Sequence, residues 1–206
     1  MKNFKLRKDL SITYWDRTLY RIEATKDLPK HGIKKGDIGG YIEKEENLSD
    51  DAWVSGDAKV SGNALVSGNA LISGDAEILS NAKVLDNAEI SDNAKVFGEA
   101  WVSGKAWVSG DAEISGNAWI FGKAWVSCDV IKTREDVYNI TSNKQYNITI
   151  TPNYIHIGCE VYSKKEWFNF TDQRILEMGN KEGLNWWKQW KPILKSICDL
   201  KRGETE

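Results

Sequence analysis

The chain has few of the residues that most often carry catalysis, with two histidines and three cysteines among 206 residues. A zinc site made of three histidines is excluded when only two are present. Cys128, Cys159 and Cys198 are odd in number and widely spaced. This spacing predicts reduced, buried thiols rather than a disulfide framework or a zinc site. We therefore expect no metal ion and no other cofactor.

The sequence also lacks a long apolar run, a cleavable signal segment and a strong net charge. These absences predict a soluble protein of the cytoplasm that does not contact a membrane. The formal net charge is −2, and residues 51–128 carry 5 Lys and Arg against 10 Asp and Glu. A protein that wraps nucleic acid presents a basic surface along its length. Because this long segment is acidic, nucleic-acid binding is not expected.

A strict repeat fills the middle of the chain. Thirteen consecutive hexapeptides run from Asp51 to Cys128 without an insertion, on the pattern Asp/Asn, Ala, any residue, Val/Ile, usually Ser, usually Gly. A fixed period of six residues is typical of a β-helix, in which three hexapeptides close one triangular coil. Val or Ile points into the coil, Ala fits inside the corner, and Gly and Asn tolerate the corner's unusual dihedral angles. The repeat predicts a mainly β protein with a parallel β-helix of about four to five coils.

The repeat divides the chain into three parts: an N-terminal cap of strand and turns over 1–41, the β-helix over 42–133, and a small α+β capping domain over 134–206. Ile42 and Leu48 lie at six-residue steps before Val54, so a degenerate first coil is expected to begin near Ile38. A half-buried strand before it is predicted by three alternating apolar residues: Tyr20, Ile22 and Ala24. An open β-helix end exposes unpaired backbone, so both ends need a cover.

The β-helix is expected to end abruptly. Val130 still fits the small-residue position, but Lys132 falls where an inward aliphatic residue is needed. The following region predicts three short strands over 137–141, 146–151 and 154–158, with a turn at Pro152-Asn153.

Two helices are predicted after these strands. Thr171-Asp172 opens the first, which ends near Gly179. The second starts near Leu184, and Pro192 is expected to kink or restart it. An apolar stripe on the second helix predicts packing against the parent fold. The stripe comprises Trp186, Trp187, Trp190, Ile193, Leu194, Ile197 and Leu200.

Residues 18 apart are expected to stack on one outer face of the β-helix. Face one carries Trp53, Leu71, Glu89, Trp107 and Trp125; face two carries Lys59, Glu77, Lys95 and Glu113; face three carries Leu65, Lys83, Trp101 and Trp119. Face two alternates in sign, as a solvated face does. Faces one and three carry paired Trp on adjacent coils, and such a large outward apolar patch normally marks an interface.

Three interpretations of the outward Trp residues stay open. The C-terminal domain folds back over them, or copies of the chain associate through them, or they form a ligand platform on which bases, sugars or cations stack. The candidate interface or ligand residues are Trp53, Trp101, Trp107, Trp119 and Trp125.

The hexapeptide pattern of residues 51–128 resembles the left-handed β-helix of hexapeptide acyltransferases and of the zinc-dependent carbonic anhydrases with that fold. The resemblance implies a left-handed coil, and it is specific for fold rather than activity. Those acyltransferases use a His as general base near an inserted loop, and those anhydrases need a His cluster on the coils. Here His31 and His156 both lie outside the uninterrupted repeats. His156 alternates with Ile155 and Ile157, which is typical of a strand-face residue. We expect no catalytic residue and no enzyme activity.

The ends of the chain resemble phage and prophage proteins. The similar segments are Tyr20-Arg21-Ile22, Gly36-Asp37-Ile38-Gly39-Gly40-Tyr41-Ile42-Glu43, Asn47-Leu48-Ser49, Ile157-Gly158-Cys159 and Glu166-Trp167. This resemblance implies a small accessory phage product in the cytoplasm of an infected bacterium.

Three functional hypotheses follow from these patterns. The first is a non-catalytic, homo-oligomeric binding protein that inhibits a host defence protein through protein–protein interaction. The second is an oligomeric sponge that sequesters a nucleotide immune signal between subunits. The third is a hexapeptide acyltransferase-like enzyme whose base is not recognisable from the sequence.

Overall fold

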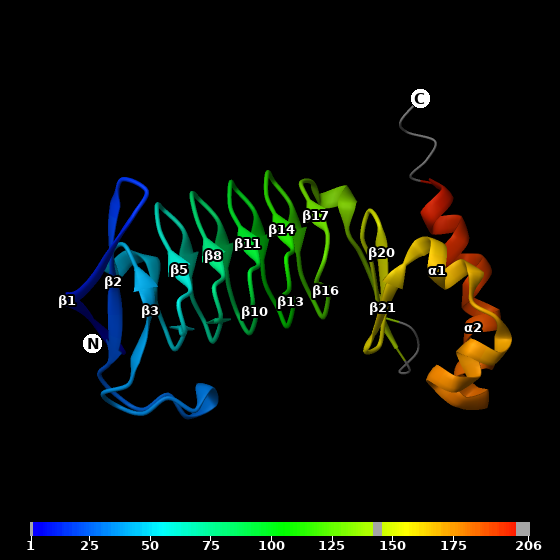
Figure 1. Ribbon diagram of the computed structural model, residues 1–206, viewed down its shortest axis with the longest axis horizontal. Helices are drawn as coiled ribbons and strands as arrows, with labels where there is room; N and C mark the ends of the chain where they lie inside the picture. Colours follow the sequence, from blue (N-terminus) through cyan, green and yellow to red (C-terminus); the bar gives the residue numbers. More distant parts are fainter. Residues whose placement is uncertain (1, 142–145, 201–206) are drawn as a thin grey trace.

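The protein is a parallel β-solenoid of about five turns, with an antiparallel sheet at its N-terminal end and a small α+β unit at its C-terminal end (Figure 1). The computed structural model describes residues 2–141 and 146–200, apart from the side chain of Leu200. The fold class expected from the sequence is confirmed: the molecule is mainly β, and its helices follow the solenoid.

The solenoid is built from two-residue strands, one in each hexapeptide. They are β4 (Trp53–Val54), β5 (Lys59–Val60), β6 (Leu65–Val66), β7 (Leu71–Ile72), β8 (Glu77–Ile78), β9 (Lys83–Val84), β10 (Glu89–Ile90), β11 (Lys95–Val96), β12 (Trp101–Val102), β13 (Trp107–Val108), β14 (Glu113–Ile114), β15 (Trp119–Ile120), β16 (Trp125–Val126) and β17 (Val130–Ile131). Every third strand pairs in parallel, so three sheets form the three faces. Lys95 pairs with Glu77 on one side and Glu113 on the other, which confirms the expected 18-residue register.

The side chains of the hexapeptide repeat lie in the environments that the sequence predicts for them. The Ala and Val/Ile side chains of the repeats are buried and form one continuous core. Gly74 has φ +67°, and a Cβ atom there would lie 2.8 Å from the backbone N of Asp92. Asp86 and Asp92 occupy the same corner position with positive φ, and their carboxylates accept hydrogen bonds of 3.0 Å from the N–H groups of Gly104 and Gly110. Each corner Asp therefore ties its own coil to the next.

The N-terminal sheet continues directly into the solenoid. Strands β1 (Phe4–Tyr14) and β2 (Arg17–Ala24) are antiparallel, and β3 (Ile38–Ile42) joins them to β5. Ile42 pairs with Val60 and Leu48 bridges Val66, so the degenerate first coil is confirmed. The predicted strand around Ile22 is confirmed as part of β2, whereas β1 was not predicted. Short 3-10 helices η1 (Pro29–His31) and η2 (Glu45–Asn47) lie in the connecting segments.

The expected register of the last coil is wrong by one residue. Val130 does not fill the small-residue position: it points outward and is 44% exposed, while Ile131 points inward and is fully buried. Glu113 pairs with Val130, so this coil is one residue shorter than the others. The small-residue position is taken by Asp129, whose backbone oxygen accepts from the N–H of Glu113. Lys132 therefore lies beyond the inward position rather than in it.

The C-terminal unit combines a four-stranded antiparallel sheet with helices. The 3-10 helix η3 (Arg134–Asp136) leads into β18 (Tyr138–Thr141), β19 (Asn147–Ile150), β20 (Tyr154–Ile157) and β21 (Glu160–Ser163), followed by α1 (Lys164–Asn169) and α2 (Asp172–Leu200). The three predicted strands are confirmed, and β21 and α1 were not predicted. Helix α2 breaks at Gly179 and Asn180, close to the predicted boundary between two helices. Pro192 lies inside α2 with helical dihedral angles, so the helix does not restart there.

Helix α2 packs on its own sheet rather than on the coils. Trp186, Trp187 and Leu194 are buried in a second core with Ile148 and Ile155 of the sheet, and no residue of the coils belongs to this core. The helices lie at the far end of the molecule from the N-terminal sheet (Figure 1). The apolar stripe was predicted to pack against the parent fold, the solenoid. This prediction is wrong, because the stripe packs against the C-terminal sheet. Ile193 was expected in the stripe but is 48% exposed and takes no part in this core. The side chain of Leu200 lies outside the described residues.

Side chains of the C-terminal unit close the last coil. Thr149 Oγ1 accepts a hydrogen bond of 3.0 Å from the N–H of Trp125, and Asn139 Nδ2 donates one of 3.1 Å to the carbonyl of Phe121. The carboxylate of Asp129 accepts from the backbone and side-chain nitrogens of Asn153 at 2.8 and 2.9 Å. The bonds of Thr149 and Asn139 satisfy backbone groups that no following coil can reach, and those of Asn153 join the turn before β20 to the end of the coil. The cysteine prediction holds only in part, because Cys128 and Cys159 are exposed and only Cys198 is buried.

Candidate functional site

Two pairs of indoles stack on neighbouring faces near the C-terminal end of the solenoid. Trp101 and Trp119 pair on face three, with ring centroids 5.7 Å apart and planes 23° apart. Trp107 and Trp125 pair on face one, with centroids 5.0 Å apart and planes 6° apart. Trp101, Trp107 and Trp119 are 37%, 44% and 36% exposed, and Trp125 is half-buried. The C-terminal unit reaches one ring of each pair, with His156 against Trp125 and Arg134 over Trp119, and it does not bury the pairs.

Trp53 is not part of this surface. It is 1% exposed and belongs to the solenoid core. A Cβ atom at Gly39 would lie 2.8 Å from the Trp53 ring and 2.6 Å from Ile22, so β2 and β3 press directly on this indole. Its assignment as an interface or ligand residue is therefore wrong. The reason is that the N-terminal sheet covers the first coil, which the repeat pattern alone does not reveal.

The face-three stack is closed by cations at both ends. The ammonium group of Lys83 lies 5.2 Å from the Trp101 ring, and the guanidinium of Arg134 lies 5.1 Å from the Trp119 ring. Phe121, which is 49% exposed, contacts the side of Trp119 at 5.5 Å. Cation–π contacts of this kind stabilise an exposed ring by about 0.5–1 kcal/mol each. Both outer ring faces of this stack are thus occupied by the protein's own side chains.

The face-one stack is closed at one end only. The His156 ring lies 5.2 Å from Trp125. The opposite face of Trp107 is turned toward the preceding coil, where Glu89 is the ladder partner of Trp107. None of the described rings or cations contacts this face. The indole N–H groups of Trp107 and Trp125 donate to the hydroxyls of Ser91 and Ser109 at 3.3 and 3.4 Å, which fixes the orientation of both rings. The outer face of Trp107 therefore lies beside Glu89, with no described ring or cation over it.

Two lysines lie on the edge between the two stacks. The first position of the hexapeptides carries Asp51, Asp57, Asn63, Asn69, Asp75, Asn81, Asn87, Asn93, Glu99, Lys105, Asp111, Asn117 and Lys123. Lys105 and Lys123 are the only cations in the set, and they are 18 residues apart, on adjacent coils of one edge. Neither forms an ion pair with any residue in the described part of the chain. Sequence reasoning missed this pair because it took the position as Asp or Asn; a comparison across the thirteen repeats would have found it.

A pocket of about 280 Å³ lies beside this edge, where the solenoid meets the C-terminal sheet. Its lining includes Lys105, Trp107, Lys123, Trp125, Asn147, Thr149 and His156. His156 is 2% exposed, and its Nδ1 atom has no hydrogen-bond partner among the described residues. Burial lowers the pKa of His156 from 6.5 to about 4, against an opposing effect of the Asp129 carboxylate. The imidazole is therefore neutral at pH 7.

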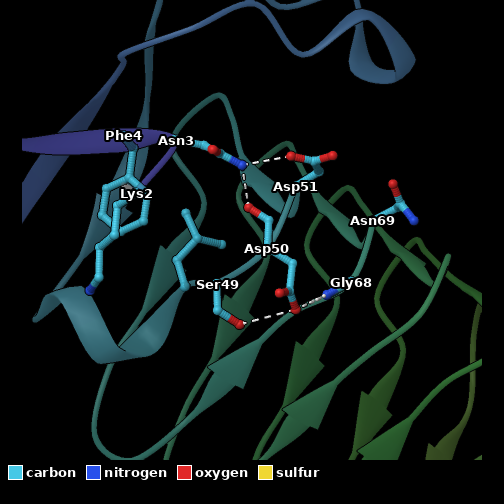
Figure 2. Close-up of a pocket in the computed structure, with 9 residues that line it drawn as sticks. Lys2, Asn3, Phe4, Ser49, Asp50, Asp51, Gly68 and Asn69 are labelled. Carbon is cyan, nitrogen blue, oxygen red and sulfur yellow. Dashed lines mark hydrogen bonds between the residues drawn. The ribbon is translucent and has the colours of Figure 1, made fainter.

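A larger cavity, of about 730 Å³, lies at the N-terminal end of the solenoid (Figure 2). Its polar groups already pair with one another. Asn3 Nδ2 donates to the carbonyl of Asp50 at 2.5 Å and to the carboxylate of Asp51 at 2.6 Å, while Gly68 N donates to the carboxylate of Asp50 at 3.0 Å. These bonds fasten the first residues of the chain to the coils, which is a structural role.

The remaining sequence candidates do not converge on a catalytic arrangement. His31 lies on η1, and its Nε2 contacts the backbone oxygen of Asp51 at 2.9 Å, near the opposite end of the solenoid from His156. Among residues 2–141 and 146–200, no three His, Cys, Asp or Glu side chains group as metal ligands. No helix within those ranges has the length and apolar character needed to cross a bilayer.

Comparisons with known proteins bear on the fold. The YdcK beta solenoid repeat family matches residues 58–74, which contain strands β5, β6 and β7 of the second coil. This similarity agrees with the β-solenoid seen here and concerns one short stretch of it. No curated protein matches the chain.

Proposed function

We propose that this chain is a non-catalytic binding protein and that it binds through an indole edge, defined here as Trp101, Lys105, Trp107, Trp119, Phe121, Lys123 and Trp125. The observation that carries the proposal is the placement of the two unpaired lysines between two indole stacks. In the other repeats the same position is acidic or an amide. Trp, Phe and cations concentrated on one exposed strip are typical of binding surfaces.

The environment of His156 supports binding rather than catalysis. A general base must reach the proton that it removes. The imidazole is almost fully buried between Trp125 and the C-terminal sheet, and the low pKa makes it a weak base. This residue therefore has the character of a packed strand residue.

The partner that we propose is a protein with an acidic and apolar surface. Lysines flanked by exposed rings complement such a surface, while the acidic remainder of the repeats disfavours other orientations. The resemblance of the terminal segments to phage proteins gives the biological setting of the proposal, in which the partner is a host defence component. Self-association through the same edge belongs to this proposal as well.

A capture experiment from host lysate tests this function. The wild-type protein is compared with Trp101→Ala/Trp119→Ala and with Lys95→Ala/Glu113→Ala, a control pair on charged face two. The wild type and the control are expected to retain the same host protein, and the indole variant is expected to lose it. Retention by the indole variant, or no specific retention by the wild type, contradicts the proposal.

The second candidate is the oligomeric nucleotide sponge, and the pocket beside Lys105 and Lys123 is the observation that favours it. A thermal-shift screen separates the candidates, since a ligand that binds only the folded state raises the melting temperature. A shift with nucleotides favours the sponge. A shift with an acyl-CoA favours the acyltransferase-like enzyme and contradicts the non-catalytic reading.

A further inference from the structure

We infer that the protein associates head to tail, with the β-hairpin tip Trp15-Asp16 of one copy inserted in the pocket beside Lys105 and Lys123 of a second copy. The Trp15 ring enters the pocket, and the Asp16 carboxylate pairs with the two ammonium groups. The inference rests on the proposed function only in taking the indole edge as a binding surface. It names the occupant of the pocket and assigns a role to the hairpin at the opposite end of the molecule.

The hairpin tip holds an exposed aromatic ring in an unfavourable backbone conformation. Trp15 and Asp16 form the two-residue turn between β1 and β2, and Tyr14 pairs with Arg17 on either side of it. Trp15 is 82% exposed, more than any other large apolar residue in the described part of the chain. Its φ is +55°, at a position where two-residue hairpin turns favour glycine or asparagine. A strained backbone that carries an exposed ring is typical of a functional site.

The carboxylate at the tip is unpaired among the described residues. No Lys, Arg or His of residues 2–141 and 146–200 forms an ion pair with Asp16. The guanidinium of the neighbouring Arg17 is bonded to the Glu43 carboxylate instead, at 2.8 and 2.9 Å. The tip therefore presents one ring and one unpaired carboxylate. This is the acidic and apolar chemistry proposed above for a partner of the indole edge.

The pocket complements the tip in charge and in size. Lys105 and Lys123 line it on adjacent coils, about 4.8 Å apart along the solenoid. Neither forms an ion pair with a described residue, so the Asp16 carboxylate of a second copy supplies the missing countercharge. Trp107 and Trp125 give the pocket an apolar wall. A cavity of about 150 Å³ accepts a benzene ring, so a pocket of about 280 Å³ accepts the larger indole.

The tip and the pocket can meet only between copies. The hairpin of β1 and β2 stands at one end of the solenoid, and the C-terminal sheet, which borders the pocket, stands at the other (Figure 1). Between Trp53 and Trp125 on face one lie four coil steps of about 4.8 Å each. A contact between two different patches is heterologous, so it builds a ring or an open chain of copies rather than a two-fold dimer.

Two variants of the full-length chain each remove one half of the contact. Trp15→Gly/Asp16→Asn removes the tip and gives the turn a residue that it favours. Lys105→Asn/Lys123→Asn removes the charge of the pocket and restores the residue found at other corners. In sedimentation velocity the purified wild type is expected to grow beyond two chains as its concentration rises. Each variant alone is expected to stay monomeric, with a melting temperature close to that of the wild type.

A mixture of the two variants tests the pairing directly, because each retains the half that the other lacks. The equimolar mixture is expected to form a dimer with one chain of each kind and to grow no further. Added salt is expected to weaken this dimer. Lys95→Asn, a control on face two, is expected to associate as the wild type does.

Three results would overturn the inference: a wild type that stays monomeric, a mixture that stays monomeric, or a tip variant that assembles as the wild type does. No host protein is present in these measurements. The capture experiment therefore remains a separate test of the proposed function.

Discussion

Each residue position in the repeat has a fixed environment, and the cost of a substitution depends on that position more than on residue type. Val96 and Lys95 are neighbours in β11, yet Val96 is fully buried and Lys95 is exposed. Lys95 Nζ lies 4.0 Å from the carboxylate of Glu77. Exposed ion pairs of this kind stabilise a fold by about 0–1 kcal/mol.

Val96→Asp is expected to lower the free energy of unfolding on the order of 3–5 kcal/mol, because it buries an unpaired carboxylate among stacked aliphatic side chains. Lys95→Ala should lower it by less than about 1 kcal/mol. Chemical denaturation of both variants measures the difference. Equal transition midpoints would show that the assignment of inward and outward positions is wrong.

The buried imidazole of His156 makes stability depend on pH. Its pKa is about 4 in the folded protein and 6.5 for the ordinary group. Below pH 6.5 His156 becomes protonated in the unfolded chain but stays neutral in the folded protein. Stability is therefore lost as the pH falls toward 4. Between pH 7 and pH 4.5 this residue should account for a loss of about 2–3 kcal/mol.

His156→Phe keeps a ring against Trp125 and removes the titration. The variant should therefore lose less stability than the wild type when both are unfolded by denaturant at pH 7 and pH 4.5. Identical losses in the two proteins would mean that His156 is not held neutral by burial. Carboxylates that titrate in this range affect both proteins alike and cancel in the comparison.

At the scale of one coil, the corner determines how successive turns join. Asp92 has φ +58°, a conformation that is strained for most residues, and its carboxylate accepts a hydrogen bond from the N–H of Gly110. Asp92→Ala keeps the strain and removes the hydrogen bond, with an expected loss of about 1–3 kcal/mol. Asp92→Gly removes the strain as well and should change stability by less than about 1 kcal/mol. Thermal melts of the two variants test this, and a more stable Ala variant would contradict it.

The end of the solenoid depends on the element that covers it. A chain that stops at Lys132 loses the bonds from Thr149, Asn139 and Asn153 to the last coil. The exposed edge of backbone groups should then recruit another copy, so aggregates or end-to-end assemblies are expected in light scattering. A monomer with an unchanged melting curve would refute the capping role of residues 134–206.

At the scale of the whole molecule, the indole edge should govern association. Trp107 and Trp119 are exposed and contribute one ring to each stack. If the edge joins subunits, Trp107→Ala/Trp119→Ala converts the wild-type oligomer to a monomer with little change in the melting temperature at equal monomer concentration. Light scattering and a thermal melt measure both quantities. A stable variant with the mass of the wild-type oligomer would rule out association through the edge.

Much of the molecule follows from the sequence because a short period makes register a local property. Residues 18 apart must stack once three hexapeptides close a coil, and this predicted both indole pairs, the charged face and the buried Val/Ile column. The substitution of Lys at positions 105 and 123 is equally visible in the sequence once the repeats are aligned with one another.

Only the tertiary structure decided which of these residues remain accessible. Trp53 obeys the same pattern as Trp107, but contact with β2 and β3 buries it. The shortened coil at Asp129, the placement of His156 on Trp125 and the pocket beside Lys105 all arise where the C-terminal sheet meets the last coil. Such contacts join residues about 20 or more positions apart without any period, so no repeat pattern encodes them; they depend on how the ends dock on the solenoid.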